Sequence, residues 1–211
     1  SPLPAINSLV FRIAYPSSTI TISGYSFIPV FQTCVATICT KNTSSCYIES
    51  QTSITAVLNE NQDTGNCTIK MYFSNPEGTS VPISSALVDI KTSPTITSAL
   101  PTSAYAGSTV TVFGANFIFG SQSCSATVCS VAATACSVAS SGSVVIVLSS
   151  SAAAGSCVVA VRFSNPSSAL ATSASGLLNV VAAPSITSVD PAAAYAGSVV
   201  TLTGSNFISG N

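Results

Sequence analysis

The amino-acid sequence of 211 residues repeats itself with a displacement of 90 positions. Residues 94–121 and 184–211 are identical at 17 of 28 aligned positions without a gap. The same displacement carries Tyr15 to Tyr105 and the tetrapeptide 73–76 to 163–166. A unit that recurs at one fixed length is a supersecondary module that stacks with its neighbours in an array. The repeat therefore predicts three segments, at 1–92, 93–182 and 183–211.

The third segment is long enough for only the first two strands of a module. Two strands alone bury too little apolar surface to be stable. We therefore expect either that the chain continues or that a neighbouring molecule completes the module by strand addition. Ser1 stands at a repeat boundary without a start Met or a signal sequence, which is typical of a window on a longer, processed protein.

The local pattern of each repeat predicts strands and no helix. In the second repeat, Val110 and Val112 alternate with threonines, as in a half-buried strand, whereas 144–148 is apolar throughout and should be central. Gly, Pro, Ser and Asn separate such runs. The expected strands lie at 95–99, 108–114, 124–129, 136–139, 144–148, 156–164 and 176–182. Seven short strands in 90 residues predict an all-β fold of tandem Ig-like sandwiches.

Residues at the start of each repeat resemble those of a known family. The third repeat has Pro184, Ala196-Gly197 and the run 200–207, which together look like the opening of an IPT/TIG domain. The second repeat matches at Pro94, Ile96, Pro101, Gly107, Gly114, Asn116 and Phe117, and the first departs at Ser17 and Ser26. The resemblance covers the whole chain. It implies non-catalytic, Ig-like modules of the kind found in cell-surface receptors, adhesion and fibrous proteins, some transcription factors, and beside carbohydrate-active enzymes.

The shared motif residues are expected to have structural roles. Gly114 and Gly204 should end a strand at a turn, with positive φ. The aromatic residues Phe117 and Phe207 should fold back into the core. Three tyrosines precede the second strand and should be packed and hydrogen-bonded rather than free to bind a ligand: Tyr15, Tyr105 and Tyr195.

The eight cysteines all recur at the 90-residue displacement, four in each complete repeat. They are Cys34, Cys39, Cys46, Cys67, Cys124, Cys129, Cys136 and Cys157. A tetrathiolate zinc site would need two close Cys pairs, and Cys46 and Cys67 do not form one. With no His in the chain, the cysteines predict two disulfides per module and an oxidising compartment.

Four cysteines allow three pairings. Cys39 and Cys46 flank a short turn, so the preferred pairing is Cys39–Cys46 with Cys34–Cys67 and, in the second repeat, Cys129–Cys136 with Cys124–Cys157. Cys34–Cys46 with Cys39–Cys67 is the alternative, because the end of one strand and the start of its neighbour meet at one pole of the sandwich.

Composition excludes several classes of function. Only 5% of residues are charged and the net charge is −1, which excludes a basic nucleic-acid footprint. The longest strongly apolar run, 144–148, is too short to span a membrane. Two sequons, at Asn42 and Asn66, are candidate N-glycosylation sites, and neither recurs in the second repeat. Glycan cover or self-association would keep so uncharged a surface soluble.

The sequence offers little for catalysis. Without His, the serines have no activating base, and the acids form no pair at matching repeat positions. Residues 59–63 contain the one local acidic cluster, but they lack the spacing of a calcium loop and are expected to form a solvated loop. No enzyme activity, cofactor or metal is predicted.

The leading hypothesis is a structural subunit of an extracellular or cell-surface fibre or appendage, glycosylated and self-associating into a filament. Linkers are nearly absent, and Pro94 and Pro184 should stiffen the junctions of a rod-like array. Two alternatives stay open: the stalk of an adhesin or receptor ectodomain, and an accessory module of a carbohydrate-active enzyme.

Overall fold

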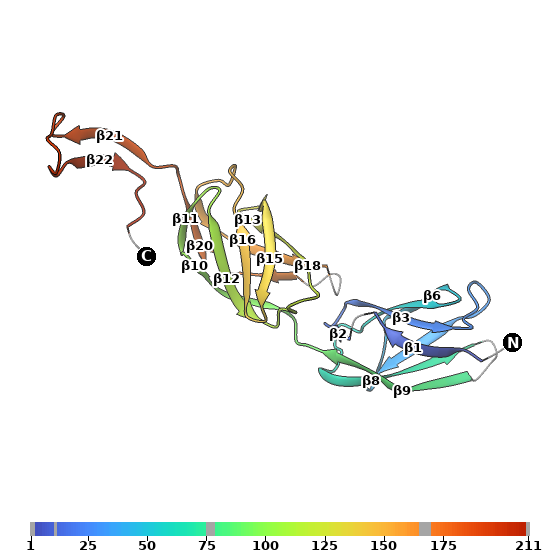
Figure 1. Ribbon diagram of the computed structural model, residues 1–211. Helices are drawn as coiled ribbons and strands as arrows, with labels where there is room; N and C mark the ends of the chain where they lie inside the picture. Colours follow the sequence, from blue (N-terminus) through green and yellow to red (C-terminus); the bar gives the residue numbers. More distant parts are fainter. Residues whose placement is uncertain (1–2, 11, 75–78, 165–169, 210–211) are drawn as a thin grey trace. The chain divides into compact units, whose positions relative to one another are not determined.

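The structure is a computed structural model that describes residues 3–10, 12–74, 79–164 and 170–209. Its regular elements are β-strands (Figure 1). The chain divides into two compact units: 1–95 with 116–124 and 162–171, and 96–115 with 125–161 and 172–211. The boundary between these units crosses the second repeat.

The first repeat forms two sheets. One contains, in order, β1 (Ala5–Leu9), β3 (Thr19–Tyr25), β7 (Ser53–Val57) and β6 (Ser45–Ser50). The other contains β2 (Ile13–Ala14), β9 (Thr79–Ile90), β8 (Gly65–Phe73), β4 (Cys34–Ile38) and β5 (Lys41–Asn42). Together they form the all-β, Ig-like sandwich that the strand pattern predicts.

Alternation along the strands builds the core of this sandwich. Ile20 and Ile22 of β3 are buried, whereas Thr21 between them is only partly covered. Along β8, Ile69, Met71 and Phe73 point inward and the residues between them are exposed. Side chains from both sheets belong to one buried cluster, whose burial supplies most of the stabilising free energy of such a fold.

The second repeat reproduces this arrangement. One sheet has the order β10 (Thr95–Leu100), β12 (Thr109–Ala115), β16 (Ser143–Val147) and β15 (Ala135–Ser140). The strands of the other layer form two smaller sheets: β11 (Ser103–Tyr105), β20 (Leu178–Val181) and β17 (Gly155–Cys157), and β14 (Val131–Ala132), β13 (Cys124–Val128), β18 (Val159–Phe163) and β19 (Leu170–Thr172). The strand at 143–147 is central, as its apolar sequence predicts.

The third repeat contributes β21 (Ser185–Asp190) and β22 (Thr201–Ser205), which pair antiparallel with the same bulge position as β1 and β3. The seven strands expected in the second repeat are all present, but the expected strand at 156–164 is interrupted at Val158. The two- and three-residue strands β11, β14 and β19 are additional. Runs this short show no measurable alternation, so the sequence pattern cannot reveal them.

The expectation of positive φ at the strand-ending glycines is wrong. Neither Gly114 nor Gly204 has positive φ; the residue with positive φ comes two positions later, at Asn116 and Asn206. A Cβ on Gly204 would collide with the carbonyl oxygen of Ser185 and the ring of Phe207. The glycine is therefore needed for close approach of a neighbouring strand and an aromatic ring.

The phenylalanine that follows this turn packs in the core of both complete repeats. Phe27 and Phe117 are buried and contact Phe73 and Phe163, with ring centroids 5.8 Å and 5.5 Å apart. These contacts confirm the core role expected for Phe117. Phe207, in the two-strand third repeat, is half exposed instead.

Candidate functional site

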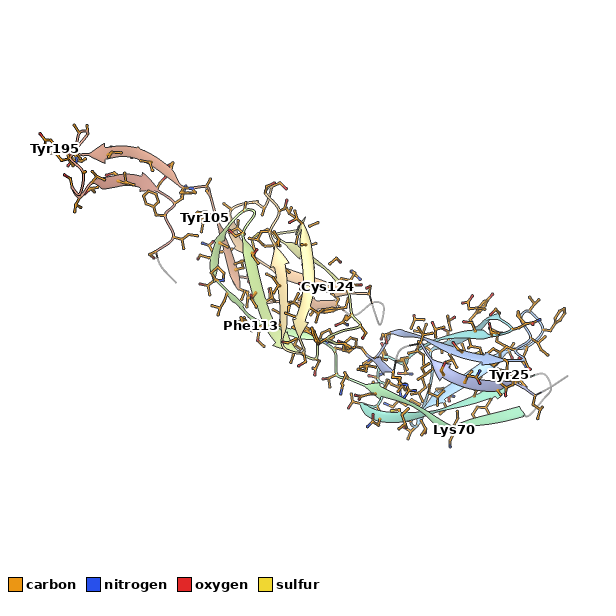
Figure 2. The ribbon with its side chains drawn as sticks, viewed as in Figure 1. Tyr25, Lys70, Tyr105, Phe113, Cys124 and Tyr195 are labelled. Carbon is orange, nitrogen blue, oxygen red and sulfur yellow. A yellow bond between two sulfur atoms is a disulfide. The ribbon has the colours of Figure 1, made fainter. Side chains whose placement is uncertain are left out.

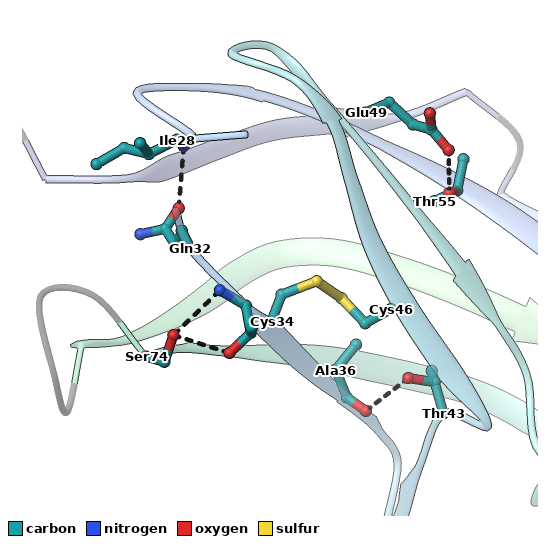
Figure 3. Close-up of a disulfide and its surroundings, with 10 residues drawn as sticks. Ile28, Gln32, Cys34, Ala36, Thr43, Cys46, Glu49, Thr55 and Ser74 are labelled. Atoms are coloured by element: carbon teal, nitrogen blue, oxygen red, sulfur yellow. Dashed lines mark hydrogen bonds between the residues drawn. A yellow bond between two sulfur atoms is a disulfide. The ribbon is translucent and has the colours of Figure 1, made fainter. Parts of the chain in front are cut away.

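The first disulfide of the first repeat joins its two sheets. Cys34 begins β4 in one sheet and Cys46 lies in β6 at the edge of the other, with their Cα atoms 5.6 Å apart (Figure 3). The hydroxyl of Ser74 accepts hydrogen bonds from both the amide and the hydroxyl of Thr33, which ties the end of β8 to the start of β4. The Cys34–Cys46 disulfide therefore fixes the spacing of the two layers at one end of the sandwich.

The second disulfide lies at the opposite end of β4. Cys39 follows β4 in a left-handed conformation and is bonded to Cys67, with Cα atoms 4.7 Å apart. The amide of Cys39 also donates to the carbonyl of Thr68 at 3.1 Å. Cys129 and Cys157 are bonded in the same way in the second repeat, and Cys124 and Cys136 are also disulfide-bonded. The prediction that all eight cysteines form disulfides is confirmed.

The preferred connectivity is wrong, and the structure has the alternative. Neither Cys39–Cys46 nor Cys34–Cys67 exists in the first repeat, and Cys129 bonds Cys157 rather than Cys136, so Cys124–Cys157 is excluded as well. The register of β4 and β8 is the physical reason. Cys34 pairs with Phe73, so it lies about 20 Å along β8 from Cys67, at about 3.3 Å per residue.

A groove of about 620 Å³ opens beside the Cys34–Cys46 bond. The exposed ring of Tyr47 and the carboxylate of Glu49, both on β6, line this groove. Val30, in the loop that precedes β4, also lines it. Thr55 donates its hydroxyl to one oxygen of Glu49 at 2.8 Å (Figure 3). The equivalent positions of the second repeat are Ser137, Ala139 and Gly120, so the second repeat lacks this chemistry.

The acidic segment 59–63 is tied to a lysine. The ammonium of Lys41 donates to the carbonyl of Asn61 and lies 3.3 Å from a carboxylate oxygen of Asp63. Thr40 donates to the other oxygen at 2.6 Å. This bond is the main cause that lowers the pKa of Asp63; desolvation opposes it, and the hydrogen bond and charge of Lys41 lower the pKa further. In the described part of the chain, no group of three His, Cys, Asp or Glu side chains could hold a metal ion.

Both sequon asparagines are exposed. Asn42 lies in the two-residue strand β5, where its side-chain oxygen accepts from Thr37 at 2.7 Å. Asn66 lies in β8 next to the disulfide-bonded Cys67. Asn42 is thus exposed, but it lies in a short strand that follows the turn at 39–40. No helix of the described residues is long and apolar enough to cross a bilayer.

Tyr15 is a buried tyrosine whose hydroxyl bonds to a loop 101 residues later in the chain. Its side chain is 1% exposed, and its hydroxyl donates to the backbone carbonyl of Asn116. Gln122, which is itself buried, donates to the same hydroxyl at 3.4 Å. Burial raises the pKa of Tyr15, and the bond from Gln122 offsets part of this shift. The side chain of Asn116 donates to the carbonyl of Ser93 at 3.3 Å, so one residue holds both the tyrosine and the linker.

The second compact unit contains the same contact 90 residues later. Tyr105 donates its hydroxyl to the carbonyl of Asn206 at 2.7 Å and accepts from the amide of Ile208 at 3.1 Å. Asn206 donates to the carbonyl of Ala183 at 3.1 Å, as Asn116 does to Ser93. We call this pairing of a tyrosine with the loop that begins at Asn116 or Asn206 the tyrosine joint.

The expectation that these tyrosines are packed and hydrogen-bonded is confirmed for Tyr15 and Tyr105. Tyr195 differs, because it is 92% exposed on the turn that joins β21 and β22 (Figure 2). The sequence analysis did not identify the partners. A signal existed for the glutamine partner alone, since Gln32 recurs 90 residues later as Gln122.

Comparison with known families identifies the second repeat. The profile of the IPT/TIG domain matches residues 94–177, so this segment belongs to the IPT/TIG family, as the motif residues predict. No curated protein matches the sequence.

Several solved structures match this chain at low sequence identity. The full extracellular region of plexin A4 matches with a TM-score of 0.60 and 16% identity over 90% of this chain and 16% of the plexin chain. SGBP-B of Bacteroides ovatus, in complex with a mixed-linkage heptasaccharide, has a TM-score of 0.34 and 15% identity over 83% of this chain and 45% of its own. Murine CEACAM1b has a TM-score of 0.29 and 14% identity over 85% of this chain and 100% of its own. The plexin match shows the fold.

Proposed function

We propose that the chain is a non-catalytic structural subunit of an extracellular, glycosylated fibre or surface appendage made of tandem Ig-like modules. One observation carries this proposal: the parts that recur every 90 residues are structural. The cysteines, the core phenylalanine and the tyrosine joint recur, whereas the sequons and nearly all charged residues do not. A module selected for its scaffold is what a fibre subunit requires.

The distribution of charge supports lateral contact between such modules. Arg162 is the single charged residue in the sequence between 93 and 182. In isolated soluble modules about a quarter of all residues are normally charged, and a net charge keeps copies apart. A nearly uncharged module is suited to packing against others or to a cover of glycans.

The disulfides support an extracellular location. All cysteines of the described residues are disulfide-bonded. Such bonds form and persist in secretory and extracellular environments and are rare in the cytosol. Both sequon asparagines are exposed and would meet the glycosylation machinery on the same route.

Negative-stain microscopy of native material tests the fibre role. Long filaments with a regular axial repeat are the expected result. Dispersed rods of a single chain length would contradict the proposal.

The second candidate is the stalk of an adhesin or receptor, and the groove of the first repeat favours it. Tyr47 and Glu49 supply an exposed aromatic ring and a carboxylate that the second repeat lacks. If this candidate is right, dispersed rods should bind a partner. The double variant Tyr47→Ser with Glu49→Ala, which introduces the residues of the second repeat, should abolish that binding.

A further inference from the structure

The groove of the first repeat presents an aromatic ring and a carboxylate side by side. Tyr47 and Glu49 stand two residues apart on β6 with the buried Ile48 between them, so both side chains lie on the outer face of the sheet, about 7 Å apart along the strand. Thr55 donates to one oxygen of Glu49 at 2.8 Å (Figure 3). Within the described residues, Glu49 takes part in no ion pair. The carboxylate is therefore oriented but not matched by a cation.

The face that carries this groove stays open in a module that has a neighbour on each side. In the second repeat, which the first precedes and the third follows, the equivalent positions are Phe119, Gly120, Ser137 and Ala139. All four residues are exposed. The exposure of the groove is therefore a property of this face of the module.

A ring and a carboxylate at this spacing suit one kind of ligand group. The face of an aromatic ring attracts a cation within about 6 Å of its centre. A guanidinium is flat enough to stack on the ring while its N–H groups bond a carboxylate, whereas an ammonium is a compact point charge. The groove therefore fits the side chain of an arginine.

The second repeat supplies such an arginine. Arg162 lies on β18 between the buried residues Val161 and Phe163, so its exposed side chain projects from the outer face of its sheet. It is the single charged residue between 93 and 182, and within the described residues it takes part in no ion pair. Tyr72 stands at the equivalent position of the first repeat, so the groove and the arginine occur on different repeats.

We propose that Arg162 of one molecule docks in the groove of a second copy of this chain, with its guanidinium stacked on Tyr47 and bonded to Glu49. Charge complementarity identifies the occupant. Residues 1–92 contain four basic and five acidic residues, a net charge of −1, whereas 93–182 carry one arginine and no acid, a net charge of +1. Contact between the first repeat of one copy and the second repeat of another therefore joins opposite net charges.

The exposed cations of the first repeat, Arg12 and Lys70, are poorer occupants. Either would bring together two first repeats that each have a net charge of −1, and Lys70 lacks the flat guanidinium. The two surfaces of the proposed contact lie on different repeats, so the contact is heterologous and repeats from copy to copy without closing.

This inference rests on the proposed function, because it supplies a contact between the subunits of a fibre. A single solvent-exposed ion pair contributes little affinity. Its main effect is to select which repeats meet, since a like charge at either position would oppose the contact. Neighbouring copies are therefore offset by one repeat.

Photo-crosslinking of the 211-residue chain tests the contact. Benzoylphenylalanine replaces Val30, which lines the groove and is 93% exposed. Chains labelled with ¹⁴N and ¹⁵N are mixed in equal amounts, so that links between copies carry both labels. The expected result is a mixed-label link from position 30 to β18 or to β13 beside it, at protein concentrations on the order of 1 mM. The same probe at Phe119, in the equivalent loop of the second repeat, should give no such link. Absence of the link, or links spread over other strands, would overturn the inference.

Charge reversal tests the pair itself. Arg162→Glu and Glu49→Arg should each lower the yield of the mixed-label link about tenfold, and both together in one chain should restore it because the pair is then reversed. Arg12→Glu is the matched control, since it changes the net charge as Arg162→Glu does and should leave the yield unchanged. All three side chains are exposed, so the urea midpoints of the variants should equal that of the unmodified chain. Equal yields for Arg162→Glu and Arg12→Glu, or no recovery in the double variant, would overturn the pair.

The failure of this contact and the failure of the fibre role are distinguishable. Filaments in native material without the link from the groove to β18 would refute the docking of Arg162 alone. The link together with dispersed rods in native material would refute the fibre role alone. A groove that links to a different protein in native material, and not to a second copy, would overturn the inference and favour the stalk.

Discussion

Cys34 lies opposite Phe73 in the register that joins β4 to β8, six residues along β8 from Cys67. This register leaves Cys39, at the far end of β4, as the residue that can reach Cys67. The first disulfide therefore crosses between the sheets, whereas the second closes one pole within a sheet. Each constrains a different part of the unfolded chain.

Removal of each disulfide should lower stability according to the loop that it closes. Cys39–Cys67 spans 28 positions and Cys34–Cys46 spans 12. Chain entropy predicts a loss of about 3.6 kcal/mol when Cys39 and Cys67 are both replaced by Ala. It predicts a loss of about 2.9 kcal/mol when Cys34 and Cys46 are both replaced. Urea unfolding of the two double variants measures the difference. A peptide map without reductant that links 39 to 46 would contradict the connectivity itself.

Replacement of Tyr15 by Phe should destabilise the first compact unit. The change leaves the ring in place but removes the hydroxyl that serves the Asn116 carbonyl and the Gln122 amide. Loss of a buried hydrogen-bonding group of this kind costs about 1–2 kcal/mol. Urea unfolding measures it, with Tyr25→Phe as the control because that side chain is half exposed. Equal losses in both variants would show that the buried hydroxyl has no special role.

Alkaline pH should weaken the same contact. Burial raises the pKa of Tyr15 above the ordinary value of about 10, so the folded state favours the neutral phenol. The resulting stabilisation is complete below pH 10 and is lost as the pH rises through the folded-state pKa. Unfolding midpoints measured between pH 8 and 12 should fall more steeply in the unmodified chain than in Tyr15→Phe. Parallel curves would contradict the expectation.

The sequence predicts those features that depend on periodic or chemically unusual residues. The alternation of Val110 and Val112 places β12, and the spacing of the cysteines predicts disulfides. It does not reveal which cysteines bond, because pairing depends on the register of β4 against β8, which the strand pattern alone leaves open. The partner of Tyr15 is likewise hidden, since a backbone carbonyl 101 residues away carries no sequence signal.

The role of Gly24 is a further case in which tertiary contact, rather than backbone conformation, decides the residue. A Cβ at this position would collide with the carbonyl oxygen of Ala5 on β1 and with the ring of Phe27. Gly24→Ala should therefore cost about 1–3 kcal/mol as the strand pair and the core ring move apart. Gly142→Ala is the matched control, because its Cβ would meet only the carbonyl oxygen of Gly114 at 3.4 Å. If both variants unfold at the same urea concentration, close approach is not the reason for Gly24.

The pKa of Asp63 provides a test of which neighbour controls an exposed carboxylate. The hydroxyl of Thr40 lowers it most, ahead of the ammonium of Lys41. NMR titration should give a midpoint for Asp63 below that of an ordinary Asp, and Thr40→Val should raise it more than Lys41→Met. Because the folded-state pKa is depressed, the contribution of this group to stability is present above the unfolded-state pKa of about 4 and is lost as the pH falls through the folded value. A larger shift from Lys41→Met would show that charge, rather than the short hydrogen bond from Thr40, holds this loop at the end of β4.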